Sequence, residues 1–391
     1  MSAPSNLPPH RADDAAAGIE VTGDFERFHQ RNDIFTRAFW DDAVRNAQTD
    51  AFFASYRMEA TPRRGDGFAQ RDFALRNASW LISDLISNRG NDTGRREGFQ
   101  AAIADDTPVA PQRQEIDDNT AMTREIKRIA TFFGADLCGI APLDDRWLYA
   151  SRVDTRDFSA APNDLAPGLT HVIVLGHRMD PDLVATYPSA LAGAATGRAY
   201  SHEAAVVLQL AAYIRNLGYR ATASMNDTGL VIPMALQAGL GEYARNQMVI
   251  TRDFGPRLRF SKIFTDLPLV ADAPRPLGVR AFCDICTKCA DACPVKALPF
   301  GPPEVSTDVS AIRGVRKWTS DASKCFGFWA KLSSDCAICM RVCPFNRDFS
   351  KWRHRLWLKL ALSPARRLAL WLDRKRGARR KPAQWWAEPR G

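Results

Sequence analysis

The chain has 391 residues, of which 46% are apolar and 10% aromatic, so it is long enough to bury a large core and form two compact units. Its formal charge is +9, but residues 347–391 alone contain 14 Lys or Arg against 3 Asp or Glu, an excess of 11. The rest of the chain is therefore nearly neutral. This distribution argues against a basic groove across the folded domains, and we expect no nucleic-acid partner.

The first residues contain no apolar export segment. The pairs Arg63-Arg64 and Arg95-Arg96 are neither N-terminal nor followed by an apolar stretch, so neither reads as a twin-arginine signal. No segment reaches the roughly 18 uncharged apolar residues of a membrane span. Nine cysteines spread over a chain of this length do not suggest a secreted disulfide scaffold. We therefore expect a cytoplasmic protein.

The N-terminal part divides into a short polar end and a helical region. Residues 1–20 are rich in Pro, Ala and Asp without periodicity, which predicts disorder. Residues 21–120 are expected to form a helical region, with helices over 24–47 and 73–87 and a polar link over 88–117. The aromatic residues of this region have spacings that suit one apolar helix face, and core packing is their simplest role.

Residues 121–272 are predicted to form an α+β domain. A helix from residue 121 should stop near Gly134 and be followed by a short strand, and residues 170–177 read as a buried strand. Residues 201–219 read as a helix with Ser201 as its N-cap and Gly218 at its C-terminal end. Another strand is expected in the stretch YRATASMND, which ends in a polar loop.

Two cysteine groups follow, within residues 273–350. The first has the spacing C-x2-C-x2-C-x3-C-P, and the second ends in C-x2-C-x3-C-P. Three closely spaced thiolates can bind one 4Fe-4S cluster, while the cysteine of the C-P step reaches a neighbouring cluster, so ligands are exchanged crosswise. The expected ligands of one cluster are Cys283, Cys286, Cys289 and Cys343, and those of the other are Cys293, Cys325, Cys336 and Cys339.

Two other uses of these thiols have to be weighed. Paired C-x2-C elements also build structural zinc sites, but a zinc site does not explain the doubled C-P endings. Disulfides are not expected in a reducing compartment. The ninth cysteine, Cys138, lies in an apolar run and is expected to be a small buried side chain. A two-cluster module carries electrons, so the chemistry should lie in the larger part of the chain that precedes it.

Several stretches together resemble the cobalamin-dependent reductive dehalogenases. They are GADLCGIAPLDDRWLY (134–149), AYSHE (199–203), AAYIRNLGYRA (211–221), the loop of Asn226 and AGLGEYARNQMVITRDFGPRLRFSKIFTDLPL (238–269). Both cysteine groups follow in the order of that family. The resemblance implies a nitroreductase-like α/β core that binds base-off cobalamin, joined to a ferredoxin-like domain with two 4Fe-4S clusters. It also implies removal of halide from an organohalide, and we expect a haloaromatic one.

The resemblance also implies the residues of the site. The tyrosine proton donor of the family falls on Tyr200, its basic partner on Arg259, and a further polar group on Asn226. Arg257 is close enough in sequence to be confused with Arg259. A phenol is a weak acid at neutral pH, and a nearby cation stabilises its phenolate. Taken singly, these residues also suit a packed aromatic, a surface cation and a turn residue.

The chain does not have room for the fused reductase domains of some members of that family, so the electrons should come from a ferredoxin or flavodoxin and its reductase. Residues 351–391 form a basic tail in which leucines alternate with cations around Pro364. This tail suits an acidic electron donor or an anionic membrane surface. A helical pair packed on the protein, with solvated charges, is the simpler alternative.

Two other functions stay open at the level of sequence. One is an epoxyqueuosine reductase-like enzyme that modifies tRNA with the same cofactors, although the AYSHE tyrosine and the missing basic groove argue against it. The other is a corrinoid-carrying or electron-transfer protein without catalysis of its own.

Overall fold

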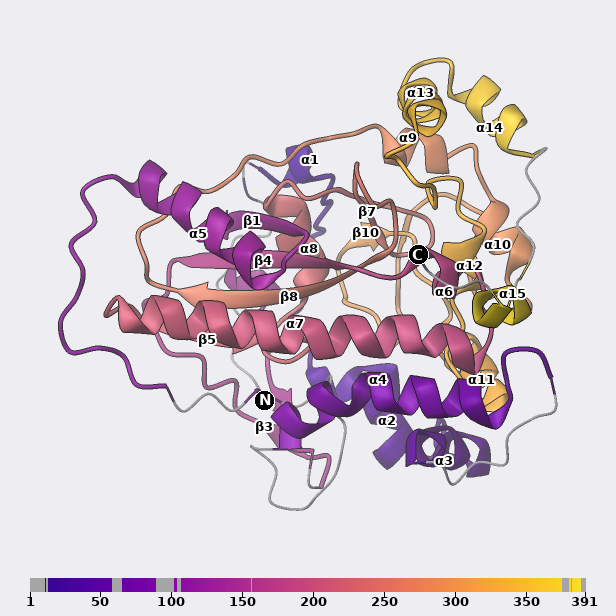
Figure 1. Cartoon of the computed structure of the whole chain (residues 1–391), viewed down its shortest axis with the longest axis horizontal. Coiled ribbons are helices and arrows are strands. Elements are labelled where there is room, and N and C mark those ends of the chain that lie inside the picture. Colours follow the sequence, from indigo (N-terminus) through magenta and orange to yellow (C-terminus); the bar gives the residue numbers. More distant parts are fainter. Residues whose placement is uncertain are drawn as a thin grey trace.

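The computed structural model describes residues 11, 13–57, 65–88, 102–103, 107–155, 157–374, 380 and 382–387. The two arginine pairs, residues 1–10 and most of the expected polar link at 88–117 lie outside the described residues. The chain forms helices, a central sheet and three small hairpin-like pairs of strands (Figure 1).

The α-helices, in chain order, are α1 Asp14–Ala17, α2 Ile34–Trp40, α3 Ala47–Ala54, α4 Gln70–Asn88, α5 Asn119–Phe133, α6 Pro181–Val184, α7 Ala190–Asn216, α8 Val231–Gln237, α9 Val279–Cys283, α10 Lys288–Ala292, α11 Ala322–Leu332, α12 Ile338–Arg341, α13 Trp352–Ala361, α14 Arg366–Arg374 and α15 Pro382–Ala387. Short 3-10 turns are η1 Gln30–Asn32, η2 Ser55–Arg57 and η3 Asp145–Trp147. The strands are β1 Leu137–Pro142, β2 Arg152–Val153, β3 Ala160–Ala161, β4 His171–Arg178, β5 Ala221–Ser224, β6 Glu242–Tyr243, β7 Val249–Ile250, β8 Leu258–Thr265, β9 Glu304–Val305 and β10 Arg316–Lys317.

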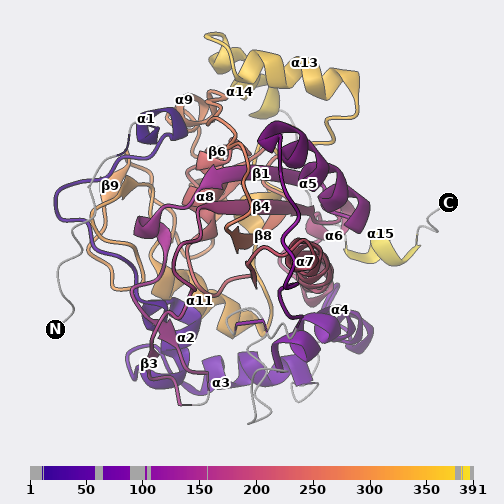
Figure 2. The ribbon, with the colours of Figure 1, turned by 90° about the vertical axis from the view of Figure 1, so that its left-hand side faces the viewer.

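The central sheet has the order β1-β4-β8-β5, and all of its neighbouring strands are antiparallel. Alternate residues point to opposite faces, so Ile173 and Ile263 pack in one core with α5 and α7. Val172 and Phe264 pack in the other core with α8. The sheet is thus sandwiched between helices, as Figure 2 shows. The predicted α+β class is confirmed, and so are the strand at 170–177 and the helix ending at Gly134, whose φ is 111°.

The long helix α7 crosses one face of the sheet and carries Tyr200. The prediction that a helix begins at Ser201 was wrong, because α7 begins at Ala190 and its N-cap is Ser189, whose side chain accepts a hydrogen bond from the backbone of Ala192. The stretch before Ser201 is rich in alanine, which has strong helix propensity, and contains no proline, so the helix continues through Gly193 and Gly197. Ser201 instead donates its hydroxyl to the carbonyl of Ser79 on α4, at 2.6 Å.

Helices α2, α3 and α4 lie beneath α7 in Figure 1. The single helix predicted over 24–47 was wrong, since this stretch forms η1 and α2 and reaches α3 only at its last residue. The side chains of Asp33 and Asn46 accept hydrogen bonds from backbone N–H groups at the first turns of α2 and α3, respectively. Each cap begins a separate helix, so no continuous helix spans this stretch. The predicted helix over 73–87 is confirmed by α4. Phe52 of α3 packs against Phe326 of α11, so this region is joined to the cysteine-rich part.

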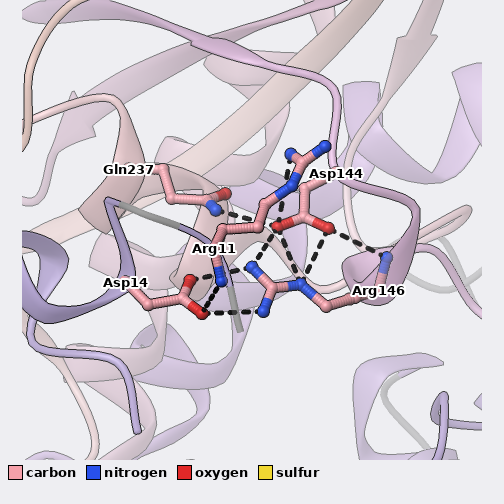
Figure 3. Close-up of polar contacts among 5 residues, drawn as sticks. All are labelled: Arg11, Asp14, Asp144, Arg146 and Gln237. Atoms are coloured by element: carbon pink, nitrogen blue, oxygen red, sulfur yellow. Dashed lines mark hydrogen bonds and ion pairs between the residues drawn. The ribbon is translucent and has the colours of Figure 1, made fainter. Parts of the chain in front are cut away.

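The helix α1 falls within the residues expected to be disordered. It is held by a buried charge cluster (Figure 3) in which Arg146 contacts Asp14 at 2.7 Å and Asp144 at 2.6 Å. Gln237 donates a further hydrogen bond to Asp144 at 2.9 Å, and Arg11 lies 3.6 Å from Asp144. Buried charges are stable only when they are paired, so this cluster fixes residues 14–17 to the core.

The C-terminal helices α13 and α14 pack on the first cysteine group and extend from one end of the molecule (Figures 1 and 2). Trp357, Leu358 and Leu370 are buried, whereas Trp352, Leu356 and Leu368 are 68%, 60% and 50% exposed. None of the described helices combines the length and apolar character that crossing a bilayer requires.

Candidate active site and cysteine groups

A cavity of about 650 Å³ lies where the core, the N-terminal helices and the cysteine-rich part meet. Its wall includes Glu20 near α1, Trp80 of α4, Tyr200 of α7, Val231 of α8 and Lys317 of β10. This size is within the range of ligand-binding cavities. Because its wall comes from five segments that are far apart in sequence, the cavity forms only when the whole chain folds.

Tyr200 lies inside α7 and is 7% exposed. Its ring stacks on Trp80, with ring centroids 4.9 Å apart and an angle of 22° between the rings. Its hydroxyl accepts a hydrogen bond from Asn226 Nδ2 at 2.8 Å. The structure therefore places Tyr200 and Asn226 in direct contact, two residues that the resemblance assigned to one site.

Asn226 is held in a rigid loop after β5. Asp227 accepts a hydrogen bond from the backbone of Met225 at 2.9 Å, and Lys262 Nζ donates to the carbonyls of Met225 and Asp227 at 2.5 and 2.9 Å. The hydroxyl of Tyr149 also donates to the Asn226 carbonyl, at 3.0 Å. These contacts direct the Asn226 amide toward Tyr200. Burial lowers the pKa of Lys262 to about 8, and the two carbonyls compensate for its lost hydration.

Arg259 is the arginine that faces this site. Its guanidinium carbon lies 5.3 Å from the centroid of the Tyr200 ring. Although burial acts against the charged form, Tyr200, Tyr187 and Glu203 raise the pKa of Arg259, so it keeps its charge. Arg257 instead donates to Asn346 and to the carbonyl of Arg347, at 2.5 and 3.0 Å. The ambiguity between the two arginines is resolved in favour of Arg259.

Tyr200 keeps its proton at neutral pH. Burial raises the pKa of its phenol, while the charge of Arg259 and the hydrogen bond from Asn226 oppose that shift. Arg259 and Asn226 thus make the pKa of Tyr200 lower than that of an equally buried tyrosine without these neighbours. The arrangement suits a group that holds its proton until a reaction removes it.

Glu203 was not singled out from the sequence, and it is not among the residues that line the cavity. It lies three residues after Tyr200 on α7, is fully buried, and neither of its carboxyl oxygens has a hydrogen-bond partner among the described residues. The spacing of three residues on a helix was the available signal, because it places two side chains on one face. His202, between them, is exposed and instead contacts the carbonyl of Gly134 at 2.9 Å.

The eight cysteines of the double motif form two neighbouring groups. Burial raises the pKa of Cys343, and the thiols of Cys283, Cys289 and Cys286 raise it further. Burial raises the pKa of Cys325 to about 12, and the neighbouring thiols of Cys336 and Cys293 contribute to this rise. Burial raises the pKa of Cys339, and its thiol neighbours are Cys325, Cys336 and Cys289. Each group thus contains one thiol from the other sequence motif. In the part of the chain that the structure describes, no three His, Cys, Asp or Glu side chains converge on a single-ion site.

Arg245 supports the loop of the first cysteine group from the core. Its side chain is buried and donates to the carbonyls of Cys283 at 2.9 Å, Cys286 at 3.1 Å, Pro299 at 2.9 Å and Gly301 at 2.8 Å. A planar guanidinium satisfies several carbonyls at once, which fixes the loop geometry. Cys138, by contrast, is a partly buried side chain packed on the main core and away from both groups.

The second cysteine group borders the cavity through Asp335. Asp335, which precedes Cys336, lines the cavity and accepts a hydrogen bond from the hydroxyl of Tyr56 at 2.5 Å. The first group packs instead with Phe282, Trp357 and the other apolar residues under α13 and α14. Tyr243 and Trp318 of that same cluster line the cavity, so the first group also lies close to it.

Comparison with known proteins agrees with this organisation. Residues 282–346 match the family model described as a 4Fe-4S double cluster binding domain. The tetrachloroethene reductive dehalogenase of Dehalobacter restrictus is 36% identical over 282 residues, which are 62% of this chain and 51% of that protein. The epoxyqueuosine reductase of Leadbetterella byssophila is 28% identical over 262 residues, 57% of this chain and 80% of that protein.

The solved structure of a catabolic reductive dehalogenase superposes with a TM-score of 0.73 at 22% identity, covering 97% of this chain and 50% of that one. At this identity the likeness concerns the fold alone. The chain spans about half the length of the dehalogenases it matches. The resemblance seen in the sequence is thus confirmed: the chain is related in sequence to the reductive dehalogenases and shares their fold over about half of their length.

Proposed function

We propose that this protein is a reductive dehalogenase, which replaces a carbon–halogen bond of an organohalide by a carbon–hydrogen bond. The observation that carries the proposal is the Tyr200 hydroxyl, held by Asn226 inside the cavity and flanked by Arg259, with a cysteine group close by. The reaction consumes two electrons and one proton at one carbon. The cysteine groups supply a route for the electrons, and Tyr200 supplies the proton.

The cavity wall fits a large polar cofactor such as cobalamin. Two enclosed N–H groups on that wall, Arg259 Nε and Trp147 Nε1, have no hydrogen-bond partner among the described residues, and a buried donor of this kind requires an acceptor. Bound cobalamin, in its reduced form, supplies a strongly nucleophilic cobalt for breaking the carbon–halogen bond. In this proposal α8 and the segment around Lys317 form part of the wall around it.

The polar side chains around Tyr200 have separate roles. Tyr200 donates its proton to the substrate carbon, and the resulting phenolate is stabilised by the hydrogen bond from Asn226 and the charge of Arg259. Preorganised donors and cations of this kind act most strongly where water is excluded. Trp80 holds the ring from the opposite face by stacking. The hydroxyl therefore keeps one orientation through the reaction.

A haloaromatic substrate is part of the proposal. The cavity wall near Tyr200 is rich in rings, which include Phe52, Tyr56 and Trp80, and ring faces favour stacking with a planar apolar ligand. The Dehalobacter relative is named for tetrachloroethene, whereas the solved dehalogenase was also studied in complex with 3-bromo-4-hydroxybenzoic acid. Free halide released from bromophenols and from tetrachloroethene, measured side by side, distinguishes the two substrate classes.

We propose that the eight cysteines bind two 4Fe-4S clusters with crosswise exchange of ligands, as their grouping supports.

Electrons from a ferredoxin or flavodoxin and its reductase would enter at the first cluster, next to α13 and α14. The exposed cations of these helices, such as Arg355, Lys359 and Arg367, favour an acidic donor. Reduction by an added ferredoxin should then slow as salt rises, and deleting residues 365–391 should weaken it. Salt-independent reduction with binding to anionic vesicles would assign the surface to a membrane. A cytoplasmic location, tested by cell fractionation, completes the proposal.

The decisive test is anaerobic reconstitution with iron, sulfide and cobalamin, followed by metal analysis and a halide assay. The proposal requires about eight irons per chain, one bound corrinoid and release of halide that depends on a reductant. Zinc in place of iron, or no uptake of corrinoid, would refute it. A protein that binds both cofactors but never releases halide would be a carrier. Turnover of epoxyqueuosine in tRNA without halide release would favour the tRNA-modifying alternative.

A further inference from the structure

Arg245 is a buried cation within the loop of the first cysteine group. It is 2% exposed, and its side chain donates hydrogen bonds to four backbone carbonyls, among them those of Cys283 at 2.9 Å and Cys286 at 3.1 Å. Its guanidinium carbon lies 4.9 Å from the centroid of the Trp318 ring. A buried cation needs polar groups that replace its hydration, and here carbonyl dipoles take that place.

The charge of Arg245 is not cancelled by an acid. None of its contacts in the described part of the chain is to an acidic side chain. The other charges near this group are Lys288, which precedes Cys289, and Asp373 of α14, which lies 2.5 Å from Lys288. Asp373 also lies 2.5 Å from Arg347. The charged side chains around the first group therefore carry an excess of positive charge.

The second cysteine group has an acid in the corresponding place. Asp335, which precedes Cys336, is 3% exposed, and its hydrogen-bond donor is the hydroxyl of Tyr56. Arg341 of α12 and, across the Tyr56 ring, Arg76 are the cations on this side, and neither forms an ion pair with Asp335 among the described residues. The buried charge that adjoins the cysteines is thus negative here and positive in the first group.

This difference in charge matters for electron transfer. The charge, hydrogen bonding and solvent exposure around an iron-sulfur cluster set its reduction potential. Uptake of one electron makes a cluster more negative by one unit, breaks no bond and requires no proton. A neighbouring cation therefore stabilises the reduced form, and a neighbouring acid destabilises it. Since both charges are buried, solvent and salt screen them weakly.

The charge of Arg245 reaches the thiols of the first motif. Burial raises the pKa of Cys283, Cys286 and Cys289, and Arg245 acts to lower the pKa of all three. Burial also raises the pKa of Cys336, and Asp335 acts in the same direction. A cation that favours negative charge on these sulfurs also favours the extra electron of a reduced cluster bound by them.

We propose that Arg245 raises the reduction potential of the cluster at the first cysteine group, so that this cluster is reduced before the other. This role rests on the proposed function, in which the cysteines bind two 4Fe-4S clusters. The external donor, such as a ferredoxin, is oxidised by one electron, and the first cluster is reduced by one. That electron then resides beside Trp318 and Tyr243, which line the cavity. A second electron reduces the second cluster, and the two electrons that one dehalogenation consumes are then in place.

The competing role for Arg245 is purely structural, as a support for the loop that leaves the potential unaffected. Substitution by Lys and by Gln separates the two roles. Lys keeps the charge and has three N–H donors, whereas Gln has two N–H donors and no charge. Neither has the planar fork of arginine, so both lose part of the support for the loop, and the charge is the main difference between them.

The experiment is a redox titration, followed by electron paramagnetic resonance, of the full chain reconstituted with iron and sulfide. The wild type should show two one-electron steps. The double variant Cys283→Ser with Cys343→Ser should keep only the second cluster and show only the lower step. Arg245→Gln should lower the reduced-to-oxidised ratio of the first cluster at least tenfold at a fixed potential, a shift of about 59 mV for one electron. Arg245→Lys should keep this step close to its wild-type position.

Arg27→Gln is the matched control, because Arg27 also donates to two backbone carbonyls, at 2.7 and 3.0 Å, but outside the cysteine-rich part. It should move neither step. Equal shifts in Arg245→Gln and Arg245→Lys, or no shift in either, overturn the role of Arg245. A wild type in which the second cluster is reduced first, or together with the first, overturns it as well, even where Arg245→Gln binds no iron. A wild type without 4Fe-4S signals refutes the proposed clusters instead, and two ordered steps without halide release refute only the dehalogenation.

Discussion

Replacing Tyr200 by Phe removes a single hydroxyl and leaves most of its surroundings intact. The ring can still stack on Trp80 at 4.9 Å and still lies under the Arg259 guanidinium, 5.3 Å away. What disappears is the acceptor for Asn226 Nδ2, at 2.8 Å, together with the proton that we assign to the reaction. Tyr200→Phe therefore separates the chemical role of the residue from its packing role.

The structural cost of this change should be small. Leaving the Asn226 amide without its acceptor should lower the free energy of unfolding by about 1 kcal/mol. This is the lower end of the range for an unsatisfied polar group, because Asn226 is only half-buried. A loss of this size lowers the melting temperature of a chain of this length by roughly 1 °C. The catalytic cost should be much larger. A positioned acid contributes about 10²–10⁴-fold, or roughly 3–5 kcal/mol at about 1.4 kcal/mol per factor of ten.

The assay measures halide release under anaerobic conditions, with iron, corrinoid and melting temperature determined on the same samples. Tyr213→Phe serves as the control, because Tyr213 lies on the same helix as Tyr200 but outside the cavity, where its hydroxyl donates a hydrogen bond to Glu125 of α5. The control should keep its activity within about twofold, well below the effect of losing a positioned acid. If Tyr200→Phe retained nearly full activity, or lost its cofactors along with its activity, Tyr200 would not be the proton donor.

Three other changes test separate parts of the molecule. Asp14→Ala should destabilise the protein by about 3 kcal/mol in urea unfolding, since it leaves the buried Arg146 with Asp144 alone. Burial acts to raise the pKa of Asp144, but hydrogen bonds from Arg146 and Gln237 hold this pKa below its ordinary value. The contribution of Asp144 to stability should therefore persist at neutral pH and be lost as pH falls below about 4, which thermal melts at different pH values measure. The double variant Cys283→Ser with Cys343→Ser should retain about four irons if ligands are exchanged crosswise, and none if each motif binds its own cluster.

The features that were readable from the sequence are those encoded locally. The cysteine motifs depend on spacings of two and three residues, and the end of α5 depends on one glycine with a positive φ. Ser201 failed as a helix start because a serine is an N-cap only when the residues before it are not helical. The alanines before Ser201 are as helical as those that follow.

The convergence of the site could not be derived from local pattern. Tyr200 lies on α7, and Asn226 lies in the loop after β5, the next strand along the chain. Arg259 reaches them only because β8 lies between β4 and β5 in the sheet. The family resemblance supplied these three residues together. It did not supply Trp80, which comes from a helix more than a hundred residues earlier, or the buried carboxyl of Glu203, which has no hydrogen-bond partner among the described residues.

The N-terminal helices contribute to the chemistry through their contacts with the cysteine-rich part. Arg76 of α4 donates to the carbonyl of Ser55 at 2.7 Å and to that of Ser333 at 3.0 Å, and its guanidinium lies 4.0 Å from the Tyr56 ring. Tyr56 in turn bonds Asp335, the residue before Cys336. One buried cation thus ties the aromatic wall of the cavity to the loop of the second cysteine group. Because these contacts are shared, a change at Arg76 should disturb both the fit of the substrate and the environment of the nearby cluster, whereas Tyr200→Phe should disturb neither.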